Sequence, residues 1–130
     1  MDISAGKMAR IGRVLSSLVG LVFLFTAFMK LKGGPQVAQG MAHMGLSESM
    51  RIPLGILELS CAVVYLIPAT SLLGAILLAG YMGGAILTHW RAGDPFVGQV
   101  VLGLLVWLGL YLRESRLRRL LPLRSREDGV

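Results

Sequence analysis

The sequence predicts an all-α integral membrane protein folded as a four-helix bundle, and three observations indicate this fold class. Of its 130 residues, 55% are hydrophobic and only 15% are charged, whereas soluble domains contain about 25% charged residues. The uncharged residues form long runs separated by short polar segments, and the mean hydropathy is +0.70. The 17 glycines suit helices that pack closely in a bilayer, where small residues line the helix interfaces.

The first apolar run, "VLSSLVGLVFLFTAFM", lies between Arg13 and Lys30. As a helix its 16 residues extend roughly 24 Å at about 1.5 Å per residue. The flanking cations add to this reach because their side chains can snorkel to the headgroups. A basic start followed by an apolar run is also typical of a signal peptide, but no small-residue cleavage site follows. We therefore expect an uncleaved span over residues 13–30.

The next uncharged stretch predicts two helices. The 30 residues from Leu59 to Thr88 contain no charge, which is too many for one span of about 20 residues. The sequence "PATS" at residues 68–71 interrupts them with a proline and small hydroxylated side chains, a combination typical of a turn. We expect spans over residues 52–67 and 71–90.

The fourth apolar run extends from Pro95 to Leu112 and has 18 uncharged residues. Asp94 is the expected N-cap, Pro95 is suited to the first helical position, and Arg113 marks the end of the run. This pattern predicts a span over residues 95–113.

Two polar segments remain outside the spans. Residues 31–51 are too polar to cross a membrane and predict a loop with a short interfacial helix. Residues 114–130 form a basic tail in which Leu117, Leu120 and Leu121 are able to face lipid. Because no boundary or repeat is evident, we treat residues 1–130 as a single membrane domain.

The formal net charge of +6 is better explained by contact with membrane headgroups than by binding of nucleic acid. The basic residues lie at the ends of apolar runs and are not mixed with exposed aromatic side chains, as a nucleic-acid surface requires. Nine Lys or Arg residues lie on the side of both termini, and the other four are Lys30, Lys32, Arg51 and Arg91. The positive-inside rule therefore places both termini in the cytoplasm. With a single cysteine, the subunit has no dithiol pair.

Glu58 is the only acidic residue inside an apolar run. A carboxylate at the centre of a membrane helix costs about 2.5–3.5 kcal/mol, so we expect it to face the bundle interior. Helical spacing agrees, because Gly55, Cys61, Ala62 and Tyr65 lie on the same face of the helix.

Polar residues from three spans should meet at the outer membrane face. We expect a shallow polar cavity there, in which Lys30 pairs with Glu58. The residues expected to bind a ligand or relay protons are Lys30, Glu58, Thr88, His89 and Asp94. A structural alternative remains open, in which these residues only hold the helices in register and Glu58 is neutral or hydrogen-bonded to His89 or Tyr81.

Small residues recur every fourth position in the third span. Gly80 and Gly84 are followed by Thr88, and Gly83 belongs to a second such series. This spacing is typical of close helix packing, so we assign Gly80, Gly83 and Gly84 to helix contacts. The local ligand spacing of zinc or iron sites is missing, and no metal site is predicted.

Four segments resemble the DoxX-like family: "FLFTAFMKL", "LGILELSCAVVYLIP", "LGAILLAGYMGGAILTHWRAGDP" and "LVWLGLYLRESRLRRLLP". The resemblance covers roughly residues 10–122 and includes, in order, Lys30, Glu58, the Gly80–Gly84 region, Thr88–His89, Gly93–Asp94 and Trp107. It implies a small four-helix protein of the bacterial inner membrane, in agreement with the predicted bundle.

The resemblance implies less about function. Related DoxX and DoxD proteins take part in membrane redox processes, including a quinone-reducing thiosulfate oxidoreductase. This chain has no cysteine pair and no evident haem ligand set, so a redox role would require a bound quinone or a partner subunit. The leading hypothesis is an accessory subunit that binds quinone, lipid or another small amphiphile, rather than an enzyme that acts alone.

Two alternatives stay open. One is a quinone-linked oxidoreductase subunit in which Glu58 and His89 relay protons. The other is a small proton-coupled transporter or an oligomeric channel. Expected partners are membrane lipid, a redox subunit or further copies of the chain, and not nucleic acid.

The predicted topology can be tested with reporter fusions. Alkaline phosphatase requires disulfides that form in the periplasm, so a C-terminal fusion is expected to be inactive and a fusion after Gly45 active. A C-terminal green fluorescent protein should fluoresce and so show that the chain is expressed. An active C-terminal phosphatase would reverse the topology and move the polar residues to the cytoplasmic face.

Overall fold

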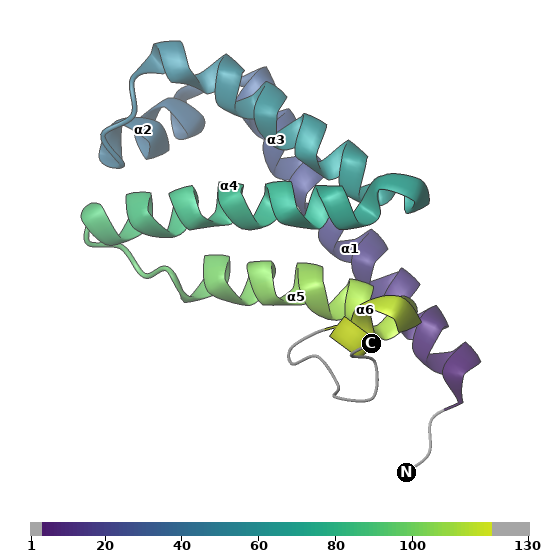
Figure 1. Ribbon diagram of the computed structural model, residues 1–130. Coiled ribbons are helices and arrows are strands. Elements are labelled where there is room, and N and C mark those ends of the chain that lie inside the picture. Colours follow the sequence, from purple (N-terminus) through teal and green to yellow (C-terminus); the bar gives the residue numbers. More distant parts are fainter. Residues whose placement is uncertain (1–3, 121–130) are drawn as a thin grey trace.

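The structure, a computed structural model, describes residues 4–120, and every regular element in that range is a helix (Figure 1). The long helices are α1 (Ala5–Lys32), α3 (Arg51–Leu66), α4 (Ser71–Arg91) and α5 (Val97–Arg113). The short elements are α2 (Pro35–His43), α6 (Ser115–Leu120) and the 3₁₀ turns η1 (Glu48–Met50) and η2 (Pro68–Thr70). The predicted short helix between the first two spans is confirmed as α2.

In residues 4–120, three helical stretches are long and apolar enough to cross a membrane: Ala5–Lys32, Glu48–Leu66 and Pro68–Arg91. The fourth, α5, is also apolar and has 17 residues, which is at the lower end of the range of about 17–25 residues for a spanning helix. The predicted class, an all-α membrane bundle, is confirmed.

The helix starts differ from the predictions at two places. Helix α1 begins at Ala5 rather than at residue 13, because the Ser4 side chain accepts a hydrogen bond from the Lys7 backbone N–H and caps the helix earlier. Helix α5 begins at Val97, so the expected N-cap role of Asp94 is wrong. The Asp94 backbone N–H instead donates to the His89 carbonyl, which holds Asp94 in the turn that ends α4.

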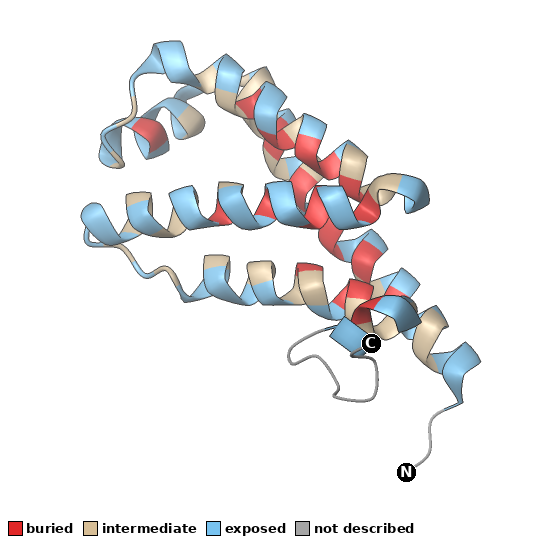
Figure 2. Cartoon of the chain, viewed as in Figure 1, coloured by how far each residue is buried: buried red, intermediate tan, exposed pale blue. Residues whose placement is uncertain are grey.

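The four long helices form a ring in which α1 contacts α3 and α5, and α4 contacts α3 and α5. The buried residues gather where the helices cross, near η2 and α6 (Figure 2). There the Tyr65 hydroxyl of α3 lies 2.8 Å from the Val106 carbonyl of α5 and 3.0 Å from Ser16 Oγ of α1. This end of the bundle is therefore closed, whereas α3 and α4 diverge toward α2 and the α4–α5 turn, which we call the open end (Figure 1).

Close helix contacts occur at glycines other than those predicted. A side chain at Gly74 would collide with the Tyr65 backbone, and one at Gly12 would collide with the α5 backbone. For Gly80, Gly83 and Gly84, nothing in the described part of the chain lies within 4 Å of where a Cβ would be. Their assignment to helix packing is wrong, because this part of α4 lies beyond the point where α3 diverges from it.

The tail helix α6 also departs from expectation. Leu117 is buried against the core rather than facing lipid. Arg118 explains this position, because its guanidinium donates to the carbonyls of Tyr111 and Leu112 at 2.9 and 2.8 Å and so holds α6 against the end of α5. Residues 121–130 of the predicted basic tail lie outside the described residues.

The contrast between Gly74 and Gly83 gives a stability test. Gly74→Ala should lower the free energy of unfolding by about 1–3 kcal/mol, because the new methyl group overpacks the α3 backbone. Gly83→Ala should leave stability unchanged or raise it by up to about 1 kcal/mol through helix propensity. Thermal unfolding of both variants in the same detergent checks this, and equal effects would contradict the difference in packing between the two glycines.

Candidate functional site

A cavity of about 660 Å³ lies at the open end of the bundle. All four long helices and the segment Met44–Met50 line it. Most of the lining side chains are apolar, and the polar ones are Thr26, Lys30, Glu58, Tyr81, Thr88, His89 and Gln99. Ligand sites in proteins commonly have volumes of about 300–1,000 Å³ and a few convergent polar groups, so the cavity has the size and composition of a small-molecule site.

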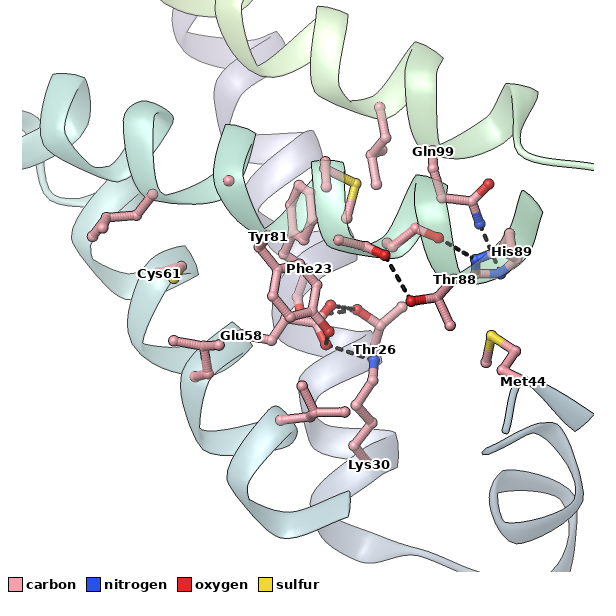
Figure 3. A pocket seen from close by; sticks show the side chains of 18 of the residues that line it. Phe23, Thr26, Lys30, Met44, Glu58, Cys61, Tyr81, Thr88, His89 and Gln99 are labelled. Carbon is pink, nitrogen blue, oxygen red and sulfur yellow. Dashed lines mark hydrogen bonds and ion pairs between the residues drawn. The ribbon is translucent and has the colours of Figure 1, made fainter. Parts of the chain in front are cut away.

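The Glu58 carboxylate accepts hydrogen bonds from two neighbouring helices (Figure 3). Its Oε2 accepts from Lys30 Nζ at 2.6 Å and from the Tyr81 hydroxyl at 3.0 Å, while Oε1 accepts from the Thr26 hydroxyl. The Glu58 side chain is 3% exposed and that of Lys30 is 26% exposed. The predicted pairing of Lys30 with Glu58 is confirmed. All these partners donate, which matches a carboxylate that only accepts.

Local sequence explains how the helices place this cluster. Thr26 and Lys30 are four residues apart on α1, so their side chains share one face. The stripe predicted around Glu58 is confirmed, since Gly55 and the other members of the stripe are buried. A side chain at Gly55 would press against Lys30 and Leu31, so this glycine brings α3 close enough to α1 for the ion pair.

His89 and Gln99 form a second polar group at the cavity wall. His89 Nδ1 lies 2.7 Å from the Ala85 carbonyl, which can only accept, so Nδ1 carries a hydrogen. In the neutral ring Nε2 is then an acceptor, and the Gln99 amide nitrogen lies 3.2 Å from it. Gln99 was not predicted from the sequence, although it is the only amide side chain in the fourth apolar run, which was a usable signal.

Of the other two predicted site residues, the structure places Thr88 at the cavity and Asp94 away from it. The Thr88 hydroxyl donates to the Gly84 carbonyl at 2.7 Å and Thr88 lines the wall. Asp94 Oδ1 instead lies 2.9 Å from His43 Nε2, because the turn after α4 places it beside α2. The expected approach of Asp94 to Glu58 is therefore wrong. Within residues 4–120, no group of three or more His, Cys, Asp or Glu side chains is arranged to hold a metal ion.

The segment after α2 covers one end of the cavity. Met44, Leu46 and Met50 contribute side chains to the lining. Arg91 Nη2 donates to the Met44 carbonyl at 2.8 Å, and this bond ties the segment to the end of α4. These apolar residues were not predicted from the sequence to belong to the site, because their position at the cavity depends on how the loop folds back.

The cavity opens sideways between α3 and α4. Leu57 of α3 and Ile76 of α4 line it and are also 51% and 54% exposed. In a membrane, such exposed apolar side chains on spanning helices face the acyl chains. This side of the cavity therefore faces lipid.

The comparisons with known proteins agree with the sequence resemblance. The chain is similar to the DoxX-like family, whose profile matches residues 14–111. The match includes every residue that lines the cavity. No curated protein and no solved structure is significantly similar to the chain.

The ion pair predicts a specific pattern of stabilities. Lys30→Met should lower the free energy of unfolding by about 3 kcal/mol, the lower end of the range for breaking a buried pair, because Lys30 is partly exposed. Adding Glu58→Gln should recover most of the loss, since no unpaired charge then remains. The exposed Lys32→Met is the matched control and should change little. Unfolding curves for the parent and the three variants check this, and a loss that the second substitution does not relieve would argue against the pair.

Proposed function

The chain belongs to the DoxX-like family of membrane proteins, and on that premise we propose that it binds a small amphiphile, a quinone or a lipid, in the cavity at its open end. One observation supports the proposal above the others. The cavity combines about 660 Å³ of mostly apolar lining with hydrogen-bonding groups at its walls and an opening toward the membrane. An amphiphile has the same two parts, an apolar chain and a polar head.

The polar groups at the wall have capacity left for a ligand. Lys30 carries three N–H donors, and in residues 4–120 only the bond to Glu58 uses one of them. The Gln99 amide has a second N–H and a carbonyl oxygen beyond its contact with His89. The polar head of a ligand can therefore be held without dismantling the Glu58 cluster.

A quinone suits these groups because its ring carries carbonyl acceptors and its tail is apolar. In this role the chain is an accessory subunit that holds a membrane-dissolved quinone, and a partner redox subunit supplies the electron transfer. The distribution of Lys and Arg supports an orientation in which both termini lie in the cytoplasm. In a bacterial inner membrane this orientation puts the cavity in the outer half of the bilayer.

A quinone-linked oxidoreductase subunit is the second candidate, and the His89–Gln99 pair favours it. A turn of the Gln99 amide changes it from a donor to an acceptor, so His89 can take up a proton without losing its partner. Among the described residues, no hydrogen bond joins His89 to Glu58. In this candidate function His89 exchanges the proton and Glu58 orients the helices.

A cavity-filling variant tests the proposal. Gly84 lines the cavity with nothing within 4 Å of where a Cβ would be, whereas Gly83 is exposed outside it. Gly84→Leu should place a side chain in the cavity and weaken binding of a short-chain ubiquinone analogue by at least about tenfold, equivalent to about 1.4 kcal/mol. Native mass spectrometry of the protein in phosphatidylcholine nanodiscs measures the bound fraction.

Gly83→Leu is the matched control, with the same substitution one position away on the lipid-facing surface, and should bind the analogue as the parent does. Both variants should keep the melting temperature of the parent or raise it slightly. Extraction of the protein purified from cells, followed by mass spectrometry, identifies the natural ligand. Equal binding by both variants, or no co-purified amphiphile, would count against the proposal.

A further inference from the structure

We infer that the cavity selects amphiphiles with an uncharged head group and that the Lys30–Glu58 pair is the element that imposes this selection. The inference rests on the proposed function and adds the chemical class of the ligand. It follows from the balance of charges at the cavity wall, which neither the family match nor the apolar lining determines.

The formal charges that line the cavity cancel. Lys30 and Glu58 are the lining residues with a full charge at neutral pH, and they are paired at 2.6 Å. The remaining titratable side chains of the lining are Cys61, Tyr81 and His89, and both His89 ring nitrogens already have hydrogen-bond partners, the Ala85 carbonyl and the Gln99 amide. A ligand therefore meets a wall with donors and acceptors but without net charge.

Two nearby arginines do not alter this balance. Arg51 directs Nη1 at the carbonyls of Lys30 and Leu31 and Nε at Glu48, outside the lining. Arg91 donates to the Met44 carbonyl and does not line the cavity. Both guanidinium groups bind backbone at helix ends, so neither is presented to the cavity as an anion site.

An anionic head group would share Lys30 with Glu58, whose charge Lys30 already neutralises. It would also lie beside the buried carboxylate, where like charges repel each other in a poorly hydrated site. A cationic head would meet Lys30 and a carboxylate that already accepts from Thr26, Tyr81 and Lys30. A neutral head with a carbonyl or hydroxyl oxygen can accept from the remaining Lys30 N–H groups while the ion pair stays intact. The wall thus excludes both charged classes by unfavourable pairing.

Removing the negative charge of Glu58 should reverse the preference of the cavity for uncharged over anionic head groups. In Glu58→Gln the amide keeps an oxygen that can accept from Thr26 and Tyr81, but the charge that neutralises Lys30 is gone. The cavity then carries one positive charge and should prefer an anionic head. The double variant Lys30→Met/Glu58→Gln has no net charge and should return to the parent preference.

The test uses two probes with the same alkyl chain, hexadecanol and hexadecanesulfonate, the second of which is ionised throughout the working pH range. Binding to the full chain in phosphatidylcholine nanodiscs is measured by native mass spectrometry. The parent should prefer the alcohol by about tenfold or more, and Glu58→Gln should prefer the sulfonate by a similar factor. The double variant should again prefer the alcohol.

The outcomes separate this inference from the proposed function. Sulfonate binding by the parent that equals or exceeds alcohol binding would overturn the charge selection while leaving amphiphile binding in place. No binding of either probe would overturn the proposed function itself. The comparison on the parent needs no variant, so it tests the charge selection even where Glu58→Gln folds poorly. If that variant folds, a preference unchanged from the parent would assign the selection to something other than the ion pair.

Discussion

The Glu58 carboxylate is the group on which the open end of the bundle depends. It is 3% exposed in a helix that spans the membrane, where an uncompensated charge is costly. Its donors come from α1 and α4, so the same contacts that satisfy the charge also hold three helices together around the cavity. Because these bonds are directional, they also set the rotation of α1 against α3. Gly55 allows the two backbones to approach closely enough for this.

The two ends of the bundle differ in how closely the helices pack. Near η2 the helices pack without space for side chains at Gly12 and Gly74, and Tyr65 ties the core with its hydroxyl. This tight end supplies the stability that allows α3 and α4 to diverge at the other end. There Gly80 and Gly84 leave room at the wall instead of bringing helices together. Small residues thus serve packing at one end and cavity volume at the other.

In the proposed function, a cavity that opens between α3 and α4 and is covered by the segment after α2 suits ligands that are already dissolved in the membrane. Leu57 and Ile76 are at the opening, while Met44, held by Arg91, covers the end near the membrane surface. This arrangement and the paired charges at the wall act on different parts of the ligand. In the proposed function the apolar opening admits the tail of the ligand, and in the proposed selection Lys30 with Glu58 determines which head groups are tolerated.

The fold class, the helix order and the Lys30–Glu58 pair follow from the sequence alone, because long uncharged runs and a lone acidic residue can be accommodated in a bilayer in few ways. Which side chains meet at the cavity depends on the tertiary structure. The position of Asp94 beside α2, the contribution of Gln99 and the open space at Gly80 and Gly84 depend on where α3 and α4 diverge. Helical spacing predicts which residues share a face, but not whether another helix lies against that face.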